Sequence, residues 1–351
     1  MKIKHISHFK NLSDYKLFGL MPDKEEIYSF ELTNKNGMKV QLINYGATVT
    51  SLQVPLSNGT LKDVVLGFDN LEAYLESYNL PSAPYFGTTV GRYAGRIHNS
   101  SFVIGGKTFQ LEANNNGNTL HGGTFGFGRK AWNVANLTSG ENPSITFGLL
   151  SEDSDENFPG EMHVYLTYTL SEQNELKLEY KATTTEDTVI NLTHHSYFNL
   201  NGHDSNVLDQ EVFIKSVKML ETDGNNIPTG NLTDLTNHAF DFRTQKKCPF
   251  PIDNSFVVNS KTDVVAKLIS SENNLQMSVY TDQPSVHIYV GGNCFDQIKG
   301  KENTAYHPSS GICFETQNFP DAPNHKHFPN SILKKGEEYI QKTVYRFENI
   351  R

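Results

Sequence analysis

Alternation of apolar and polar residues is the dominant pattern along the chain, and a period of two is typical of half-buried β-strands. In MHVYLTYTL (162–170), one face of an extended segment collects apolar or aromatic residues: Val164, Leu166, Tyr168 and Leu170. The same alternation recurs in ELKLEYKA (175–182) and in EEYIQKTVYRFEN (337–349). These segments are predicted to be long strands, each with one face in a core.

Glycine-containing pairs between β-type residues predict tight hairpin turns. They occur at three places: Asn36-Gly37, Asn58-Gly59 and Gly105-Gly106. The best helical segment is short, FDNLEAYLES (68–77). We expect the Asp69 side chain to cap its start and the Glu72 side chain to reach back to Asp69. Many strands with little helix, no repeat and no linker predict an all-β, large antiparallel β-sandwich. We expect one domain over residues 1–351, with 1–25 as an N-terminal extension packed on it.

Composition and charge narrow the class of protein. A net charge of −9 argues against a nucleic-acid groove, which needs a basic face. No run of about 18 apolar residues is present, so no membrane span is expected, and the N-terminus lacks the apolar stretch of a signal peptide. The three cysteines, Cys248, Cys294 and Cys313, are widely spaced and form no disulfide framework. A cytoplasmic protein is therefore expected.

Two adjacent histidines in NLTHHSYFNL (191–200) could be packing residues, metal ligands or a proton donor in a groove. If the run is a strand, His194 shares a largely apolar face with Leu192, Phe198 and Leu200. His195 lies on the other face, which is wholly polar or aromatic. We therefore expect the two histidines to act separately, with His195 facing a groove.

A carboxylate candidate lies in GICFETQ (311–317). Glu315 alternates with apolar neighbours, so its side chain should leave the core face, either as a solvated carboxylate or inside a pocket. The aromatic and proline-rich segment that follows, FPDAPNHKHFPN (319–330), could wall off one side of such a pocket.

Weaker candidates come from two glycine-containing segments. In LHGG (120–123) the glycines allow a close backbone approach beside His121. In TTVGRYAGRI (88–97), Arg92 and Arg96 share a face if the run is extended, and arginine suits hydroxyl or carboxylate recognition. Exposed surface residues are the ordinary alternative for all three side chains. No HExxH metal motif is present, and GxSxG and P-loop motifs are absent.

Several ordered segments together resemble the aldose 1-epimerase (galactose mutarotase) family. They span about residues 40–347: NYGATVTSLQVP, DVVLGFDNLEAYL, GTTVGRYAGRI, LHGG followed by FGRKAWNV, NLTHHSYFNL and GICFETQNFPDAPN. The resemblance implies the galactose mutarotase-like supersandwich, an isomerase acting on free aldohexoses such as galactose and glucose, and no cofactor or metal. It is compatible with a monomer or a homodimer.

The resemblance also implies roles for particular residues. Glu315 would be the general base and His195 the general acid of ring opening and closure. Arg96 and His121 would hold the sugar near its ring oxygen and hydroxyls, and Asp253 and His287 would bind hydroxyls further round the ring. The chain departs from relatives at three positions: His194 and Gly95 stand where Asn occurs, and His287 where some carry Gln. These departures bear on sugar preference.

Rival functions use the same residues differently. A glycoside hydrolase would pair Asp253 with Glu315 across a glycosidic bond. A carbohydrate-binding module would need only hydroxyl-binding groups and stacking aromatics, for which Tyr197, Phe319 and Trp132 are available. A sugar-phosphate epimerase would need a basic phosphate cradle, which no motif indicates.

Overall fold

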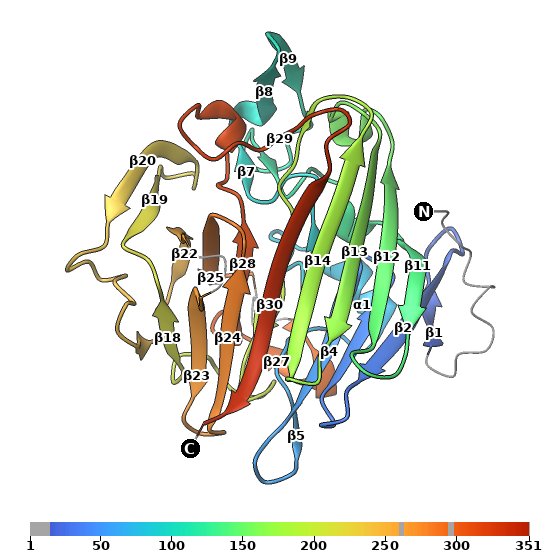
Figure 1. Cartoon of the computed structure of the whole chain (residues 1–351), viewed down its shortest axis with the longest axis vertical. Coiled ribbons are helices and arrows are strands. Elements are labelled where there is room, and N and C mark those ends of the chain that lie inside the picture. The colour runs from blue at the N-terminus through green and yellow to red at the C-terminus, as the bar shows by residue number, and fades with distance from the viewer. Residues whose placement is uncertain (1–14, 260–262, 294–297, 351) are drawn as a thin grey trace.

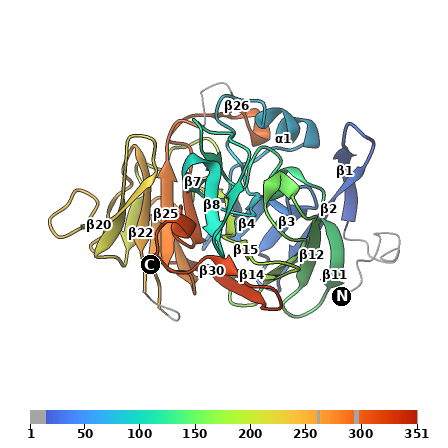
Figure 2. The same ribbon diagram turned by 90° about the horizontal axis from the view of Figure 1, so that it is seen from above.

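A computed structural model describes residues 15–259, 263–293 and 298–350. The predicted all-β class is confirmed, because strands dominate and pair antiparallel in three main sheets. Figure 1 shows the long strands of the largest sheet side by side across the molecule. Seen from above in Figure 2, the N-terminal sheet and the strands of the smaller sheets lie together on one side of this largest sheet.

The sheets are made as follows. The nine-stranded sheet has the order β11 (Asn133–Thr138), β12 (Ser144–Ser151), β13 (Met162–Leu170), β14 (Glu175–Thr184), β30 (Tyr339–Asn349), β24 (Leu275–Thr281), β23 (Ala266–Ser270), β18 (Glu211–Ile214) and β21 (Lys246–Lys247). The six-stranded sheet has the order β17 (Tyr197–Phe198), β28 (Ile312–Gln317), β25 (Ser285–Val290), β22 (Ile252–Val257), β19 (Lys218–Thr222) and β20 (Pro228–Asp234). The five-stranded sheet has the order β1 (Tyr15–Leu20), β2 (Glu26–Thr33), β3 (Lys39–Ile43), β4 (Thr48–Pro55) and β5 (Leu61–Asp63).

Short elements connect these sheets. The two-stranded pairs are β6 (Thr89–Val90) with β16 (Thr193–His194), β7 (Arg96–Ile97) with β10 (Thr119–Leu120), β8 (Ser101–Ile104) with β9 (Lys107–Gln110), β15 (Thr188–Val189) with β29 (Ile332–Leu333), and β26 (Ile298–Lys299) with β27 (Ala305–Tyr306). The helices are α1 (Leu71–Ser77) and the 3₁₀ turns His98–Ser100, Phe127–Arg129, Asp155–Asn157, Lys301–Asn303 and Ala322–Asn324. No helix in the described residues is long and apolar enough to cross a membrane.

The main core lies between the nine-stranded sheet and the other two sheets. Strand β13 is buried at every second residue, as the alternation predicts. Strands β14 and β30 also bury alternate residues on one face. These faces form one apolar cluster with inward residues of β3, such as Val40, and of β25 and β28, such as Ile288 and Phe314. Burial of this apolar area is the main force that holds the sheets together.

The hairpin predictions are confirmed, and the helix cap is wrong by one residue. Strand pairs β2–β3, β4–β5 and β8–β9 turn at the three glycine-containing pairs. Helix α1 is capped by Asn70, whose Oδ1 accepts a hydrogen bond of 2.9 Å from the Ala73 amide. Asp69 instead accepts one from the amide of Glu302, so its carboxylate is used outside the helix.

The predicted N-terminal extension and the cysteines are only partly described. Residues 15–20 form β1 and pair with β2, whereas residues 1–14 lie outside the described residues. Cys248 and Cys313 are buried, and Cys294 lies outside the described residues.

Candidate active site

The six-stranded sheet has one apolar face and one polar face. In β25 the residues Val286, Ile288 and Val290 enter the core. The alternate residues His287 and Tyr289 line a cavity of about 410 Å³. The pleat of a strand sends successive side chains to opposite faces, so one sheet both closes the core and builds the pocket floor.

Glu315 lies on this polar face of β28 between two histidines. His287 of β25 is its direct partner across the ladder. On the other side, Tyr197 and Phe198 pair with Cys313 and Ile312, and extending that register by two residues sets His195 opposite Glu315. Directly opposed side chains in an antiparallel pair lie close together. The prediction that Glu315 leaves the core face is therefore confirmed by its place in the cavity lining.

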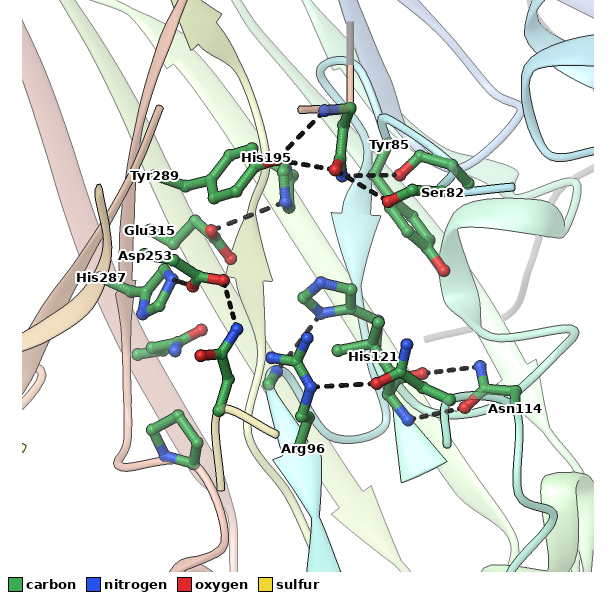
Figure 3. A pocket seen from close by; sticks show the side chains of 18 of the residues that line it. Ser82, Tyr85, Arg96, Asn114, His121, His195, Asp253, His287, Tyr289 and Glu315 are labelled. Atoms are coloured by element: carbon green, nitrogen blue, oxygen red, sulfur yellow. Dashed lines mark hydrogen bonds and ion pairs between the residues drawn. The ribbon is translucent and has the colours of Figure 1, made fainter. Parts of the chain in front are cut away.

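His195 and Glu315 meet inside the pocket. The Nε2 atom of His195 lies 3.6 Å from Oε1 of Glu315, and the two side chains are only 4% and 3% exposed (Figure 3). Nδ1 of the ring lies 3.6 Å from the Cys313 sulfur. Nε2 is therefore the ring atom directed at the carboxylate.

The segment carrying the two histidines is not one continuous strand. It forms β16, which pairs with β6, and then β17, which pairs with β28. Between them the backbone of His195 is held by Thr88 O at 2.9 Å and by the Gly87 amide at 3.0 Å.

The expected separation of the two rings holds in spite of this break. His194 lies outside the cavity lining, with Nε2 2.7 Å from the Ser196 hydroxyl. Burial, together with the charge of His195, lowers the pKa of His194 to about 3, so its ring stays neutral.

Arg96 and His121 lie next to each other in the cavity lining. They are adjacent because Arg96 pairs with Leu120 in the β7–β10 ribbon, and the His121 amide bonds to the carbonyl of Gly95. The guanidinium is oriented by a hydrogen bond of 3.1 Å from Nε to Asn115 Oδ1. Nδ1 of His121 accepts a hydrogen bond of 3.3 Å from the Gly95 amide. Burial first, and then the positive charges of His195, Arg96 and His287, hold the pKa of His121 well below its ordinary value.

The glycines of LHGG have a specific packing reason. A Cβ on Gly122 would lie 2.1 Å from the carbonyl oxygen of Gly91, and its φ of +84° is unfavourable for other residues. This close approach sets the loop that presents His121 to the cavity.

Asp253 and His287 form an ion pair on the pocket floor. Nε2 of His287 lies 2.9 Å from Oδ1 of Asp253, and its Nδ1 lies 2.8 Å from the Ser255 hydroxyl. The other carboxylate oxygen accepts a hydrogen bond of 2.8 Å from Asn226 Nδ2. These partners position both side chains before any sugar arrives.

The electrostatics of this pair favour the charged forms. Burial on its own would lower the pKa of His287, but the hydrogen bond to Asp253 and the charges of Glu315 and Asp253 outweigh it, so the pKa is raised. Burial would likewise raise the pKa of Asp253, but His287, Arg96 and His195 lower it.

All six predicted site residues therefore line one cavity: Arg96, His121, His195, Asp253, His287 and Glu315. The structure also places there residues that the sequence interpretation missed, including Ser82, Tyr85, Asn226, Ser255 and Tyr289. Tyr289 and Ser255 could have been found, because they alternate with buried apolar residues in β25 and β22. Ser82 and Tyr85 lie on an irregular segment that carries no periodic signal.

The three aromatic residues named as available for stacking do not line the cavity. Trp132 is buried in the core and donates its indole N–H to the Phe127 carbonyl at 3.0 Å. Tyr197 and Phe319 are buried outside the cavity lining. Tyr78, Tyr85 and Tyr289 are aromatic residues that line the cavity, and the Tyr85 ring lies 5.8 Å from that of His195 (Figure 3).

Arg92 does not join Arg96 in the pocket. It is 1% exposed, and its guanidinium bonds the carbonyl oxygens of Ser151, Glu152 and Pro159 at 2.7–3.0 Å. Its role is structural, because one buried guanidinium holds three carbonyl oxygens of the 151–159 segment. Within the described part of the chain, no group of three or more His, Cys, Asp or Glu side chains is arranged to hold a metal ion.

A buried imidazole–carboxylate pair beside an arginine, two further histidines and an aspartate is an arrangement at which protons can be transferred. The aldose 1-epimerase family model matches residues 28–346, and the chain belongs to the aldose 1-epimerase family. The predicted isomerase class is thereby confirmed at the level of the family.

Similar proteins agree with this assignment. The chain is 38% identical over 343 residues to the galactose mutarotase of Bos taurus, covering 94% of this chain and 97% of that protein. It is 32% identical to the aldose 1-epimerase of Escherichia coli K12, with 93% and 97% covered. Among solved structures, an aldose epimerase homologue from C. elegans superposes with a TM-score of 0.85 at 32% identity, covering 92% of this chain and 99% of that one. The predicted mutarotase-like fold is confirmed by this likeness.

Proposed function

We propose that the protein interconverts the α and β anomers of a free aldohexose, galactose or glucose, with Glu315 as general base and His195 as general acid. The observation that carries this proposal is the 3.6 Å separation of His195 Nε2 and Glu315 Oε1 inside a buried polar cavity. Ring opening needs one proton removed from the anomeric hydroxyl and one delivered to the ring oxygen. Both oxygens are bonded to C1, so an acid and a base that serve them must lie close together.

The steps balance without a co-reactant. Glu315 takes the proton of the C1 hydroxyl, the C1–O5 bond breaks as the C1 carbonyl forms, and His195 gives its Nε2 proton to O5. Rotation about C1–C2 exposes the other face of the aldehyde. The two residues then exchange roles, and the ring closes as the opposite anomer with both groups restored.

The surrounding side chains would bind and orient the sugar. Arg96 supplies donors in a fixed fork, and neutral His121 can donate through Nε2 because its Nδ1 already accepts from Gly95. Asp253 would accept hydrogen bonds from hydroxyls further round the ring. His287 would act mainly by holding Asp253 ionised and in place, since both its ring nitrogens already have protein partners.

The choice of sugar is supported by the relatives, several of which are named galactose mutarotases. The rival functions are less well supported. A glycoside hydrolase would need Asp253 as a second reacting carboxylate, yet both its oxygens already contact protein groups. The predicted cytoplasmic location and the choice between monomer and homodimer stay predictions.

Polarimetry on freshly dissolved α-galactose tests the proposal. The purified protein should speed the approach to the equilibrium rotation well beyond the spontaneous rate. No acceleration with galactose or glucose would contradict the proposed reaction, and release of reducing sugar from an oligosaccharide would support a hydrolase instead.

A further inference from the structure

Gln317 is a buried pocket residue to which none of the roles above applies. It follows Glu315 by two residues in β28, so its side chain lies on the same polar face, and it lines the cavity. The residue is 1% exposed.

The side-chain oxygen of Gln317 differs from its polar neighbours in the pocket. Oε1 is buried and has no hydrogen-bond partner among the described residues. Asp253 and His287, by contrast, have protein partners on both polar atoms of each side chain. Buried side-chain polar atoms are nearly always bonded, because an unmatched one loses its hydration without compensation.

The position of Gln317 indicates which part of a sugar it would meet. Two residues along a strand correspond to about 7 Å, so Gln317 lies well away from the carboxylate of Glu315. The chain just beyond it turns toward Arg96, because Pro320 packs against Gly95 at the start of the Arg96 strand. Gln317 therefore lies at the Arg96 end of the cavity.

We propose that Gln317 is a further substrate-binding residue, whose side-chain amide hydrogen-bonds a ring hydroxyl remote from the anomeric carbon and so contributes to sugar selection. An amide both donates and accepts, which matches the two-way hydrogen bonding of a hydroxyl. This inference rests on the proposed function, because it assumes that Glu315 meets the anomeric hydroxyl.

The test compares the steady-state kinetics of galactose mutarotation in the wild type and in Gln317→Met, which keeps the length of the side chain but removes its polar atoms. We expect KM to rise about 3- to 10-fold with kcat little changed, the loss of one hydrogen bond made equally in ground and transition states. The control is Thr188→Val, which removes another buried and unpartnered hydroxyl that lies in β15, outside the cavity. This control should leave both constants unchanged.

Monodeoxy sugars separate a direct contact from a structural effect. Against 2-deoxy-, 3-deoxy-, 4-deoxy- and 6-deoxygalactose, the loss caused by Gln317→Met should vanish for the one sugar, 3-deoxy or 4-deoxy, that lacks the bonded hydroxyl. Equal losses with every sugar, or no loss at all in an active enzyme, would overturn the assignment. If Gln317→Met does not fold, Gln317→Asn, which withdraws the amide by one methylene, is tested in the same way. A wild type without mutarotase activity would instead refute the proposed function.

Discussion

His195 and Glu315 lie beside each other: Nε2 of the imidazole, two residues before the strand β17 that pairs with β28, is 3.6 Å from Oε1 of the carboxylate. The strand on the other side of Glu315 sets His287 directly opposite it. One carboxylate therefore lies between two imidazoles with different tasks. His195 has its Nε2 directed into the cavity, whereas His287 is bound to Asp253 and Ser255.

Replacing the general acid should abolish most of the catalysis without preventing sugar binding. His195→Asn removes the group that protonates the ring oxygen, so kcat should fall about 10²- to 10⁴-fold, with a smaller change in KM. Polarimetric initial rates at several sugar concentrations measure both constants. The control is His194→Asn, a substitution on the core side of the same segment, which should retain kcat. A large loss for position 194 with none for position 195 would reverse the assignment.

Substitutions of the two arginines in the 88–97 segment should affect different properties: that of Arg92 the stability of the fold, and that of Arg96 the binding of the sugar. Arg92→Met removes a buried guanidinium that bonds three carbonyl oxygens and should lower the free energy of unfolding by about 3 kcal/mol or more. Arg96→Met should change stability little but raise KM about 10- to 100-fold, because a charged donor to the sugar is lost. Urea unfolding and steady-state kinetics on both variants provide the comparison. A destabilised Arg96 variant with unchanged KM would contradict the binding role.

The His287–Asp253 pair should make stability depend on pH in a defined window. The pKa of His287 is raised on folding, so its contribution is complete below the ordinary value of 6.5 and is lost as the pH rises through the raised value. The pKa of Asp253 is lowered, so its contribution is present above the ordinary value of 3.8 and is lost as the pH falls through the lowered value.

The wild type should therefore exceed His287→Gln in stability most between about pH 4 and 6.5, by up to about 1 kcal/mol for a pair that solvent partly screens. Urea unfolding across pH measures the difference. His163→Gln removes an exposed pair with Glu161 and should show little such dependence. A difference between the wild type and His287→Gln that grows above pH 7 would contradict the charged pair.

The alternation of the chain predicted most of what positions the site. A period of two is a local property, so the faces of β13, the exit of Glu315 from the core and the separation of His194 from His195 could all be predicted. The turns could also be predicted, because the need for glycine at a positive φ is a local property as well. The turn glycines with positive φ are Gly37, Gly59, Gly105 and Gly106.

What could not be predicted depends on contacts between distant segments. Arg92 and Arg96 have the same local pattern, yet one meets the carbonyls near Ser151 and the other faces the cavity. Trp132 offered a large aromatic face for a sugar, but the adjacent core packs around it. Asn226 reaches Asp253 from the β19–β20 hairpin, a contact that no periodicity reveals.

The most direct test of the central claim is polarimetry of fresh α-galactose with Glu315→Gln, which keeps the size of the side chain but removes the base. The account predicts that the wild type speeds mutarotation and that the variant, still folded by circular dichroism and still able to bind galactose in calorimetry, leaves only the spontaneous rate. A folded Glu315→Gln variant with wild-type activity would contradict it.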